Sequence, residues 1–455
     1  MSGSLVIIGG DAAGMSAASK ARREDPELEI IVLERGEWAS YGACGLPYYI
    51  KGEIKNIEDL IAIPPEIFRE KRNIDLRLNH EVIRILPDEK RLIVRSKKDE
   101  YELAYHNLLI STGARPLIPN IAGVNSTGVF TLRNIDDGKK IREYLQKRSP
   151  EKVLIVGGGY IGLEMAEAFQ EIGLKVYLVE LFPHVLPSFG PEISEVVEYH
   201  LKKYIQIYLG KYVNEITETN DGRLSVQIKD KKAENKEEYL VTDMILFATG
   251  IKPEVSLAQE AGIQLGITGA IAVDEYGRTN YPDIYAAGDC AEVKSIVTNK
   301  STYIPLALTA NRNGRAIGST IGGRKTLLAP VAGTAVVKVF TLEVASTGLI
   351  DLDNLHRYGF DPVKITVDSP SRAGYYPGSK MIKISLIADR KTKKILGCSM
   401  VGEEGVAKRI DIIATALYSR LTVEQLENLD LAYAPPFSPV WDPILSAARV
   451  LNGKL

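Results

Sequence analysis

Cysteine is scarce in this sequence, and long hydrophobic runs are missing. The 455 residues include only three cysteines, Cys44, Cys290 and Cys398, which lie far apart. So few and so widely separated cysteines cannot build a disulfide framework, and they fit a reducing, cytoplasmic setting. No apolar run reaches the roughly 18 residues that a membrane-spanning helix needs. The start, MSGSLVIIGG, predicts a strand rather than a signal peptide.

The chain also lacks an excess of one charge and a metal-binding pattern. Its formal net charge is -2 at pH 7, so the composition does not favour nucleic acid or an anionic membrane as a partner. The five histidines show no metal-ligand spacing with cysteine, and we expect no metal site. The length leaves room for about three domains of roughly 150 residues each.

One motif occurs twice. LVIIGGDAAGMSAASKAR near the start and KVLIVGGGYIGLEMAEAF from residue 152 each predict a strand, a glycine turn and a helix. Each is followed by an apolar strand that ends in an acid, Glu34 or Glu180. A helix N-terminus binds pyrophosphate, glycines let the backbone approach it, and the acid binds a ribose hydroxyl. The sequence therefore predicts two Rossmann-like dinucleotide-binding folds.

The second motif fits this pattern in every element, with Gly157, Gly159 and Gly162 ahead of Glu180. A carboxylate at that position accepts a 2′-hydroxyl and repels a 2′-phosphate. NADH is therefore favoured over NADPH, although a basic residue from elsewhere in the chain could still admit NADPH.

The first motif keeps Gly9 and Gly14 but has Asp11 at the middle glycine position. A carboxylate there would repel a pyrophosphate, so we expect Asp11 to point away or to cap the helix. Two adjacent dinucleotide folds suggest an electron relay between a permanent flavin and a transient nicotinamide. Asp289, after the tight turn in AAGDCAE, could accept a hydroxyl of the flavin's ribityl chain.

Cys44 stands between two glycines in SYGACGLPYYI. Pro47 predicts a helix that begins right after the thiol, and the helix dipole would then lower the thiol pKa. A single thiol cannot store two electrons as an internal disulfide. Its redox partner must come from outside, as a substrate thiol, a persulfide sulfur or oxygen. The alternative is an inert buried side chain, which is what we expect of Cys290 and Cys398.

These motifs, with ISTGARP and FATGIKP, resemble the flavoprotein pyridine nucleotide–disulfide oxidoreductases along nearly the whole chain. SYGACGLPYYI and DLAYAPPFSPVWDPI are similar to the single-cysteine branch, which includes coenzyme A–disulfide reductases, NADH oxidases and persulfide reductases. The resemblance implies an α/β fold with two Rossmann-like domains and a C-terminal α+β dimerisation domain. We expect FAD-binding at 1–117 and 252–330, NAD(P)H-binding at 118–251, and dimerisation at 331–455.

The resemblance also implies which residues hold FAD and NADH, or possibly NADPH. Tyr160 would lie over the flavin and swing aside for the nicotinamide. The NAD site would be lined by Ile161 and Gly250 as well as Glu180. FAD would contact Gly9, Gly14, Glu34, Val82, Ser111, Thr112, Gly113, Ala114, Arg133, Asp289 and Ala307.

Coenzyme A, as substrate or bound adduct, would be handled by Lys20, Arg23, Ser40, Arg72 and Asn311. Lys20 and Arg23 are spaced i, i+3 and project from one helix face, where they could bind phosphates or merely face solvent. Arg72 lies in a charged run and could equally be a surface residue.

The resemblance further implies a homodimer in which Tyr433 reaches the active site of the partner subunit, with Tyr375 or Tyr376 near it. The phenol of Tyr433 could protonate a leaving thiolate, although Tyr433 could instead be a buried packing residue.

The implied function is NAD(P)H-dependent reduction of coenzyme A disulfide, or a related small disulfide, through a mixed disulfide on Cys44. An NADH oxidase, a polysulfide or coenzyme A persulfide reductase and, more distantly, a redox-sensing flavoprotein stay open. Ala43 replaces an asparagine that helps some relatives hold coenzyme A. Ala12 stands where NADH peroxidases have a catalytic histidine, which argues against peroxidase chemistry.

Overall fold

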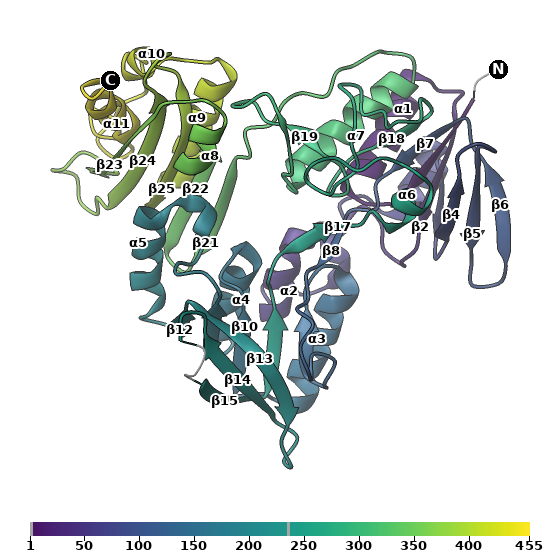
Figure 1. The fold of residues 1–455 in the computed structure, drawn as a ribbon, viewed down its shortest axis with the longest axis horizontal. Helices are drawn as coiled ribbons and strands as arrows, with labels where there is room; N and C mark the ends of the chain where they lie inside the picture. The colour runs from purple at the N-terminus through teal and green to yellow at the C-terminus, as the bar shows by residue number, and fades with distance from the viewer. Residues whose placement is uncertain (1–2, 234–236) are drawn as a thin grey trace.

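The computed structural model describes residues 3–233 and 237–455. The chain forms three bodies in a V-shaped arrangement (Figure 1). The N-terminal body and the C-terminal body form the two arms, and the middle of the sequence forms the base. None of the described helices combines the length and the apolar character that crossing a bilayer would require.

The N-terminal body is built on a five-stranded parallel sheet in the order β18-β7-β1-β2-β3. Strand β1 is buried along its whole length because both faces of the sheet are covered. Helices α1 and α7 cover one face in backbone contact, since a Cβ on Gly314 would lie 2.1 Å from the carbonyl oxygen of Ala13. The strands and helices are β1 (Ser4–Ile8), β2 (Glu29–Glu34), β3 (Asp75–Leu78), β7 (Asn107–Ile110), β18 (Ile284–Ala286), α1 (Ala12–Glu24), α6 (Ser256–Glu260) and α7 (Ala307–Ile321).

An antiparallel sheet covers the other face of this parallel sheet, and Val82 and Ile85 share a core with Val6 and Ile8. Its strands are β4 (Glu81–Leu86), β5 (Arg91–Arg95) and β6 (Glu100–Ala104), and a separate short ribbon joins β19 (Val293–Lys294) to β20 (Ser301–Thr302).

The middle body repeats the plan, with a parallel sheet in the order β12-β11-β10-β16-β9 and an antiparallel sheet β13-β14-β15. Two paired segments, β8 (Ala114–Pro116) and β17 (Ile251–Pro253), join it to the N-terminal body. Its strands are β9 (Val129–Thr131), β10 (Lys152–Val156), β11 (Lys175–Glu180), β12 (Gln206–Leu209), β13 (Lys211–Glu218), β14 (Leu224–Asp230), β15 (Glu237–Thr242) and β16 (Met244–Phe247). Its helices are α3 (Ile135–Arg148), α4 (Tyr160–Glu171) and α5 (Pro191–Leu201).

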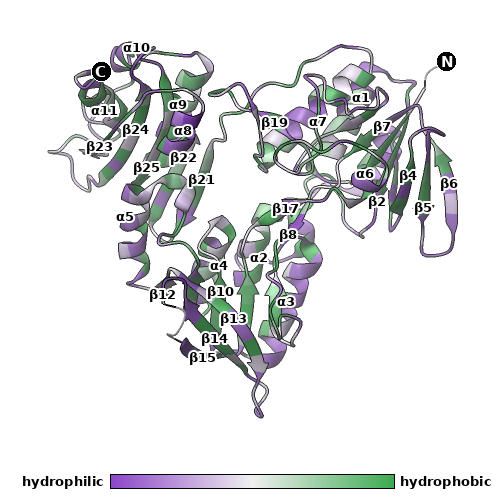
Figure 2. Ribbon diagram, viewed as in Figure 1, coloured by the Kyte–Doolittle hydropathy of each residue, from purple (hydrophilic) through white to green (hydrophobic). Residues whose placement is uncertain are grey.

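The C-terminal body contains an antiparallel sheet in the order β21-β22-β25-β24-β23. Its strands carry many hydrophobic residues (Figure 2), which share one core with residues of the helices. The elements are β21 (Ala335–Val339), β22 (Leu342–Gly348), α8 (Leu352–Arg357), β23 (Pro362–Pro370), β24 (Met381–Asp389), β25 (Ile395–Gly402), α9 (Val406–Tyr418), α10 (Val423–Glu427) and α11 (Pro443–Asn452). This combination of antiparallel strands and helices confirms the expected α+β character of the C-terminal body.

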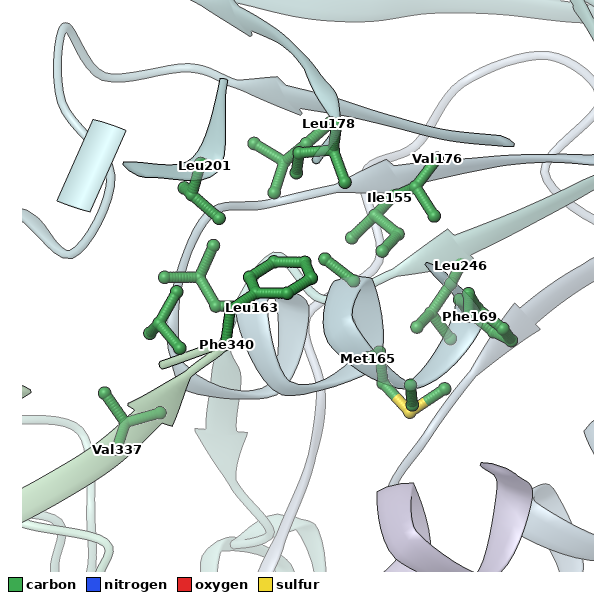
Figure 3. Close-up of a cluster of buried hydrophobic side chains, with 14 of the residues drawn as sticks. Ile155, Leu163, Met165, Phe169, Val176, Leu178, Leu201, Leu246, Val337 and Phe340 are labelled. Atoms are coloured by element: carbon green, nitrogen blue, oxygen red, sulfur yellow. The ribbon is translucent and has the colours of Figure 1, made fainter. Parts of the chain in front are cut away.

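The hydrophobic core of the middle body crosses into both neighbours. Val337 and Phe340 of the C-terminal body pack with Leu163 and other residues of α4 and its sheet (Figure 3). From the other side, Leu46 and Ile50 of the short helix α2 (Leu46–Lys51) join the same core. This helix belongs to the N-terminal stretch of the sequence but packs against α3 and α4.

Candidate active site

A continuous cavity of about 2920 Å³ lies where the three bodies meet. This volume exceeds the roughly 300–1,000 Å³ of an ordinary ligand pocket, so it can hold more than one large molecule. Cys44 and most predicted cofactor and substrate residues line it. They are Gly9, Glu34, Val82, Ser111, Thr112, Gly113, Ala114, Arg133, Gly157, Gly159, Tyr160, Ile161, Glu180, Gly250, Asp289 and Ala307, together with Arg23, Ser40, Arg72 and Asn311.

The two glycine turns are held in the same way. In the N-terminal body, the Glu34 carboxylate accepts hydrogen bonds from the backbone N–H groups of Gly10 and Gly36, both at 2.8 Å. In the middle body, Glu180 accepts from the N–H groups of Gly158 at 2.6 Å and Phe182 at 2.8 Å. A carboxylate oxygen can accept a second hydrogen bond, so each acid can still bind a ribose hydroxyl.

Gly14 and Gly162 do not line the cavity and have a packing role instead. A Cβ on Gly14 would lie 2.0 Å from the carbonyl oxygen of Gly9, and one on Gly162 would lie 2.0 Å from that of Gly157. Both glycines therefore let a helix begin directly against its strand. With helix N-termini, glycine cradles and strand-end acids in place, the residues fit two dinucleotides.

Asp11 occupies the N-cap position of α1, but the capping alternative is wrong because its side chain makes no capping bond there. The carboxylate instead accepts from the backbone N–H of Tyr41 at 3.3 Å. Burial raises the pKa of Asp11 to about 6, although Arg133 partly opposes this. At neutral pH a carboxyl with this pKa is still mostly ionised, so protonation of Asp11 reduces the expected repulsion of a pyrophosphate only as the pH falls to about 6.

Arg133 and Asp289 form an ion pair at the cavity wall, with 3.0 Å between Nη2 and Oδ2. Arg133 also donates through Nε to the carbonyl oxygen of Ala114 at 3.1 Å. Burial raises the pKa of Asp289, and the neighbouring guanidinium opposes that rise. The pair thus ties together three segments that are distant in the sequence and that carry predicted flavin contacts.

Cys44 lies in a single helical turn (Ala43–Gly45) that leads directly into α2, with Pro47 in the first turn of the helix. The predicted helix after the thiol is therefore confirmed. A Cβ on Gly45 would lie 2.3 Å from Cδ2 of Leu60, so a larger residue there would displace the Leu60 side chain. The Cys44 side chain is exposed to the cavity.

The predicted lowering of the Cys44 pKa is wrong for this structure. Although Cys44 opens to the cavity, the surrounding walls partly desolvate its thiol, and this desolvation raises the pKa. The negative charge of Glu164 raises the pKa further. A backbone hydrogen bond and the positive charge of Arg133 lower the pKa of Cys44, but both effects are smaller than these two.

Glu164 was not anticipated from the sequence. It lines the cavity from α4, and burial together with the neighbouring Glu167 raises its pKa to about 7. Glu167 accepts from Lys338 and from the backbone N–H of Phe340, and Glu171 pairs with Lys51 of α2 at 2.8 Å. Glutamates at positions 164, 167 and 171 share one helix face, and this spacing could have indicated a row of functional acids in the sequence.

Tyr160 is the first residue of α4 and lines the cavity. Its ring meets Phe189 edge-on, with centroids 5.5 Å apart, and burial raises its pKa. The adjacent Ile161 also faces the cavity.

The predicted substrate residues divide into two groups. Arg72 donates to Ser19 Oγ at 2.8 Å and stacks over Phe68, and Asn311 accepts from Ser16 at 2.6 Å. These contacts lie along one wall of the cavity, which Arg23 and Ser40 also line. Lys20 is different, since it pairs with Glu24 one turn along α1 and does not line the cavity. In this structure, Arg23 lines the cavity and Lys20 does not.

Tyr375, Tyr376 and Tyr433 lie on the C-terminal body and do not line the cavity that contains Cys44 of their own chain. The hydroxyl groups of Tyr375 and Tyr433 are hydrogen-bonded at 3.0 Å. In the single chain these two residues are 76% and 45% exposed, so Tyr433 is not packed in the core of its own body.

Cys290 and Cys398 are fully buried, as expected of inert cysteines. Within residues 3–233 and 237–455, no three His, Cys, Asp or Glu side chains form a group that could hold a metal ion.

The fold and the cavity together define a class of two-dinucleotide oxidoreductase with one exposed thiol. The family model for pyridine nucleotide-disulphide oxidoreductases matches residues 3–314, and the model for the dimerisation domain of the same family matches residues 334–443. The chain belongs to this family, which uses FAD and NAD(P)H. It is therefore an enzyme of the oxidoreductase class, with the two-cofactor architecture predicted from its sequence.

Individual relatives cover almost the whole chain. It is 41% identical over 449 residues to the NAD(P)H sulfur oxidoreductase (CoA-dependent) of Pyrococcus abyssi, and the aligned region covers 98% of each chain. It is 37% identical over 455 residues to the NADH oxidase of Methanocaldococcus jannaschii, and the aligned region covers 99% of each chain. The reduced Bacillus anthracis CoADR-RHD structure superposes with a TM-score of 0.94 and 38% identity, and covers 100% of this chain and 80% of that one.

Proposed function

We propose that this protein reduces coenzyme A disulfide, or a closely related coenzyme A persulfide, with electrons from NAD(P)H. The observation that carries the proposal is the shared cavity, in which one exposed thiol, Cys44, lies beside both dinucleotide cradles. The names of the relatives support a coenzyme A-linked sulfur substrate. We also propose the domain boundaries expected above: 1–117 with 252–330, 118–251, and 331–455.

FAD and NAD(P)H, when bound, supply the hydride and electron-pair chemistry. The chain itself supplies the thiol, the binding groups and the proton donors. We propose that Gly9, Glu34, Arg133 and Asp289 hold the flavin and that Glu180 binds the nicotinamide dinucleotide's ribose. The other predicted contacts at positions 82, 111–114, 157–162, 250 and 307 complete these two sites.

The Cys44 thiolate attacks one sulfur of the disulfide, so that a mixed disulfide forms and one coenzyme A leaves as thiolate. The partner's Tyr433, helped by Tyr375 or Tyr376, gives a proton to this leaving sulfur. Two electrons then cleave the mixed disulfide, which releases the second thiol and regenerates the Cys44 thiolate. Each turnover consumes one NAD(P)H and one proton for each disulfide.

Coenzyme A itself is proposed to lie along the wall formed by Arg23, Ser40, Arg72 and Asn311. Arginine pairs well with phosphate groups through its planar guanidinium. Lys20, paired with Glu24, would take part only if that ion pair opened. The homodimer is an essential part of this proposal, because the exposed tyrosines cannot serve the cavity of their own chain.

The proposal is tested by an anaerobic acceptor panel. The protein is reduced with NADH in a stopped-flow instrument and then mixed with coenzyme A disulfide, coenzyme A persulfide or oxygen. We expect the first two to reoxidise it quickly, and Cys44→Ser to keep flavin reduction but lose both reactions. Cys398→Ala is the matched control. Reoxidation by oxygen alone, with a sulfenic acid on Cys44 by mass spectrometry, would instead establish an NADH oxidase.

A further inference from the structure

A buried arginine joins the two surface loops that carry the tyrosines. Arg409, on α9, is only 8% exposed. Its Nη2 donates to the carbonyl oxygen of Ser371 at 3.1 Å and to that of Phe437 at 3.2 Å. Its Nε donates to Asp442 at 2.9 Å. One guanidinium therefore binds loop 371–380, which carries Tyr375, and loop 430–442, which carries Tyr433.

Further contacts reinforce this connection at the base of the two loops. Glu404 accepts from the Ser371 hydroxyl and from Arg372, whose Nε lies 2.8 Å away. The backbone N–H of Ala373 donates to the carbonyl oxygen of Pro435 at 3.3 Å, which links the loops directly. Asp442 also accepts from Ser438 at 3.0 Å. The loop bases are thus held by several hydrogen bonds.

The tips of the same loops are exposed, yet their phenols meet. Tyr375 and Tyr433 share a hydrogen bond of 3.0 Å although both side chains are open to solvent. Two exposed side chains lose conformational entropy when they are held in one geometry. The fixed loop bases reduce that cost because they bring the two rings into range.

We propose that Arg409 is a positioning residue that aligns the Tyr375–Tyr433 pair for proton transfer in the partner subunit. This inference rests on the proposed function, in which Tyr433 gives its proton to the departing sulfur. Tyr375 then donates a hydrogen bond to the phenolate that forms, and solvent returns the proton. A lysine cannot replace Arg409, because an ammonium lacks the planar fork that reaches both carbonyl oxygens and Asp442.

The test compares Arg409→Lys with Lys408→Met, a matched control whose side chain is 91% exposed on the same helix. Flavin reduction by NADH should be unchanged in both. Reoxidation by coenzyme A disulfide should slow by roughly tenfold to hundredfold in Arg409→Lys, because a misplacement of about 1 Å can cost that much. The control should reoxidise at the wild-type rate. An unslowed Arg409→Lys would overturn the inference.

A double-mutant cycle separates positioning from general damage. In a Tyr433→Phe background, Arg409→Lys should cause no further slowing, whereas an additive loss would overturn the inference. If Tyr433→Phe alone reoxidises normally, the proposed proton donor is wrong. The crystal structure of Arg409→Lys then decides, since an intact 3.0 Å phenol pair would overturn the positioning role and a separated pair would support it. If Arg409→Lys fails to fold, Glu404→Gln, which weakens the same loop base, takes its place in the cycle.

Discussion

Glu34 and Glu180 hold equivalent turns, and this symmetry leads to a paired prediction. In Glu180→Gln, the side-chain amide oxygen can still accept a hydrogen bond from one backbone N–H group. The side-chain NH2 group lies opposite the second backbone N–H group and cannot accept from it. One of the donors, Gly158 or Phe182, then loses its partner. An unsatisfied buried donor costs about 1–3 kcal/mol. If the whole of this free-energy cost reduces the binding free energy of NADH, its affinity falls by about 5- to 150-fold.

The assay measures both cofactors on both variants. Stopped-flow flavin reduction over a range of NADH concentrations gives the apparent Kd for NADH, and absorbance after gel filtration gives the FAD retained. We expect Glu180→Gln to weaken NADH binding and to keep its FAD. Glu34→Gln should lose FAD during gel filtration, because the same contacts to Gly10 and Gly36 are disturbed.

The reasoning fails if the two variants lose the same cofactor. It also fails if Glu180→Gln binds NADH as tightly as the wild type, since the turn would then not depend on its acid. NADPH serves as an internal reference: its binding should weaken less than that of NADH, because the substitution also removes repulsion of the 2′-phosphate.

Three further outcomes are expected. Gly14→Ala should purify without FAD, because its Cβ would lie 2.0 Å from the Gly9 carbonyl oxygen; a yellow, fully loaded protein would contradict this. Glu164→Gln should speed alkylation of Cys44 by iodoacetamide at pH 8, because the ionised carboxylate opposes the thiolate; Glu171→Gln is the control, and equal rates would contradict the role of Glu164. Asp11→Asn should unfold at higher urea than the wild type at pH 8 but not at pH 4, since folding raises the pKa of Asp11 from 3.8 to about 6. The folded state then binds more protons, so its stability falls as pH rises through this window, by up to about 3 kcal/mol for a shift of this size.

The parts of the site that depend on local sequence were predictable. A strand, a glycine turn, a helix and a strand-end acid follow one another within a few tens of residues. The positions of Gly157, Gly159 and Glu180 in the chain therefore imply their positions in space. The helix after Cys44 was predictable for the same reason, because Pro47 acts on its own backbone.

The parts that depend on tertiary packing were not predictable. The Cys44 pKa is governed partly by Glu164, which α4 brings near from far along the chain. Lys20 has the right helical spacing to act with Arg23, but Glu24 lies one turn away and pairs with it. No local pattern reveals that Arg409 binds two loops, since its partners at 371, 437 and 442 meet only in the folded C-terminal body.

The pairing of β8 with β17 has a consequence for how such a chain could have been assembled. Pro116 lies opposite Ile251, so the chain leaves the first body and returns to it at one point (Figure 1). A tight turn could join these two positions and leave the β18-β7-β1 order of the first sheet uninterrupted. The middle body thus has the connectivity of a cassette that gene fusion could insert at a single seam. Protein engineers who exchange it would also have to preserve its core contacts with α2 and β21.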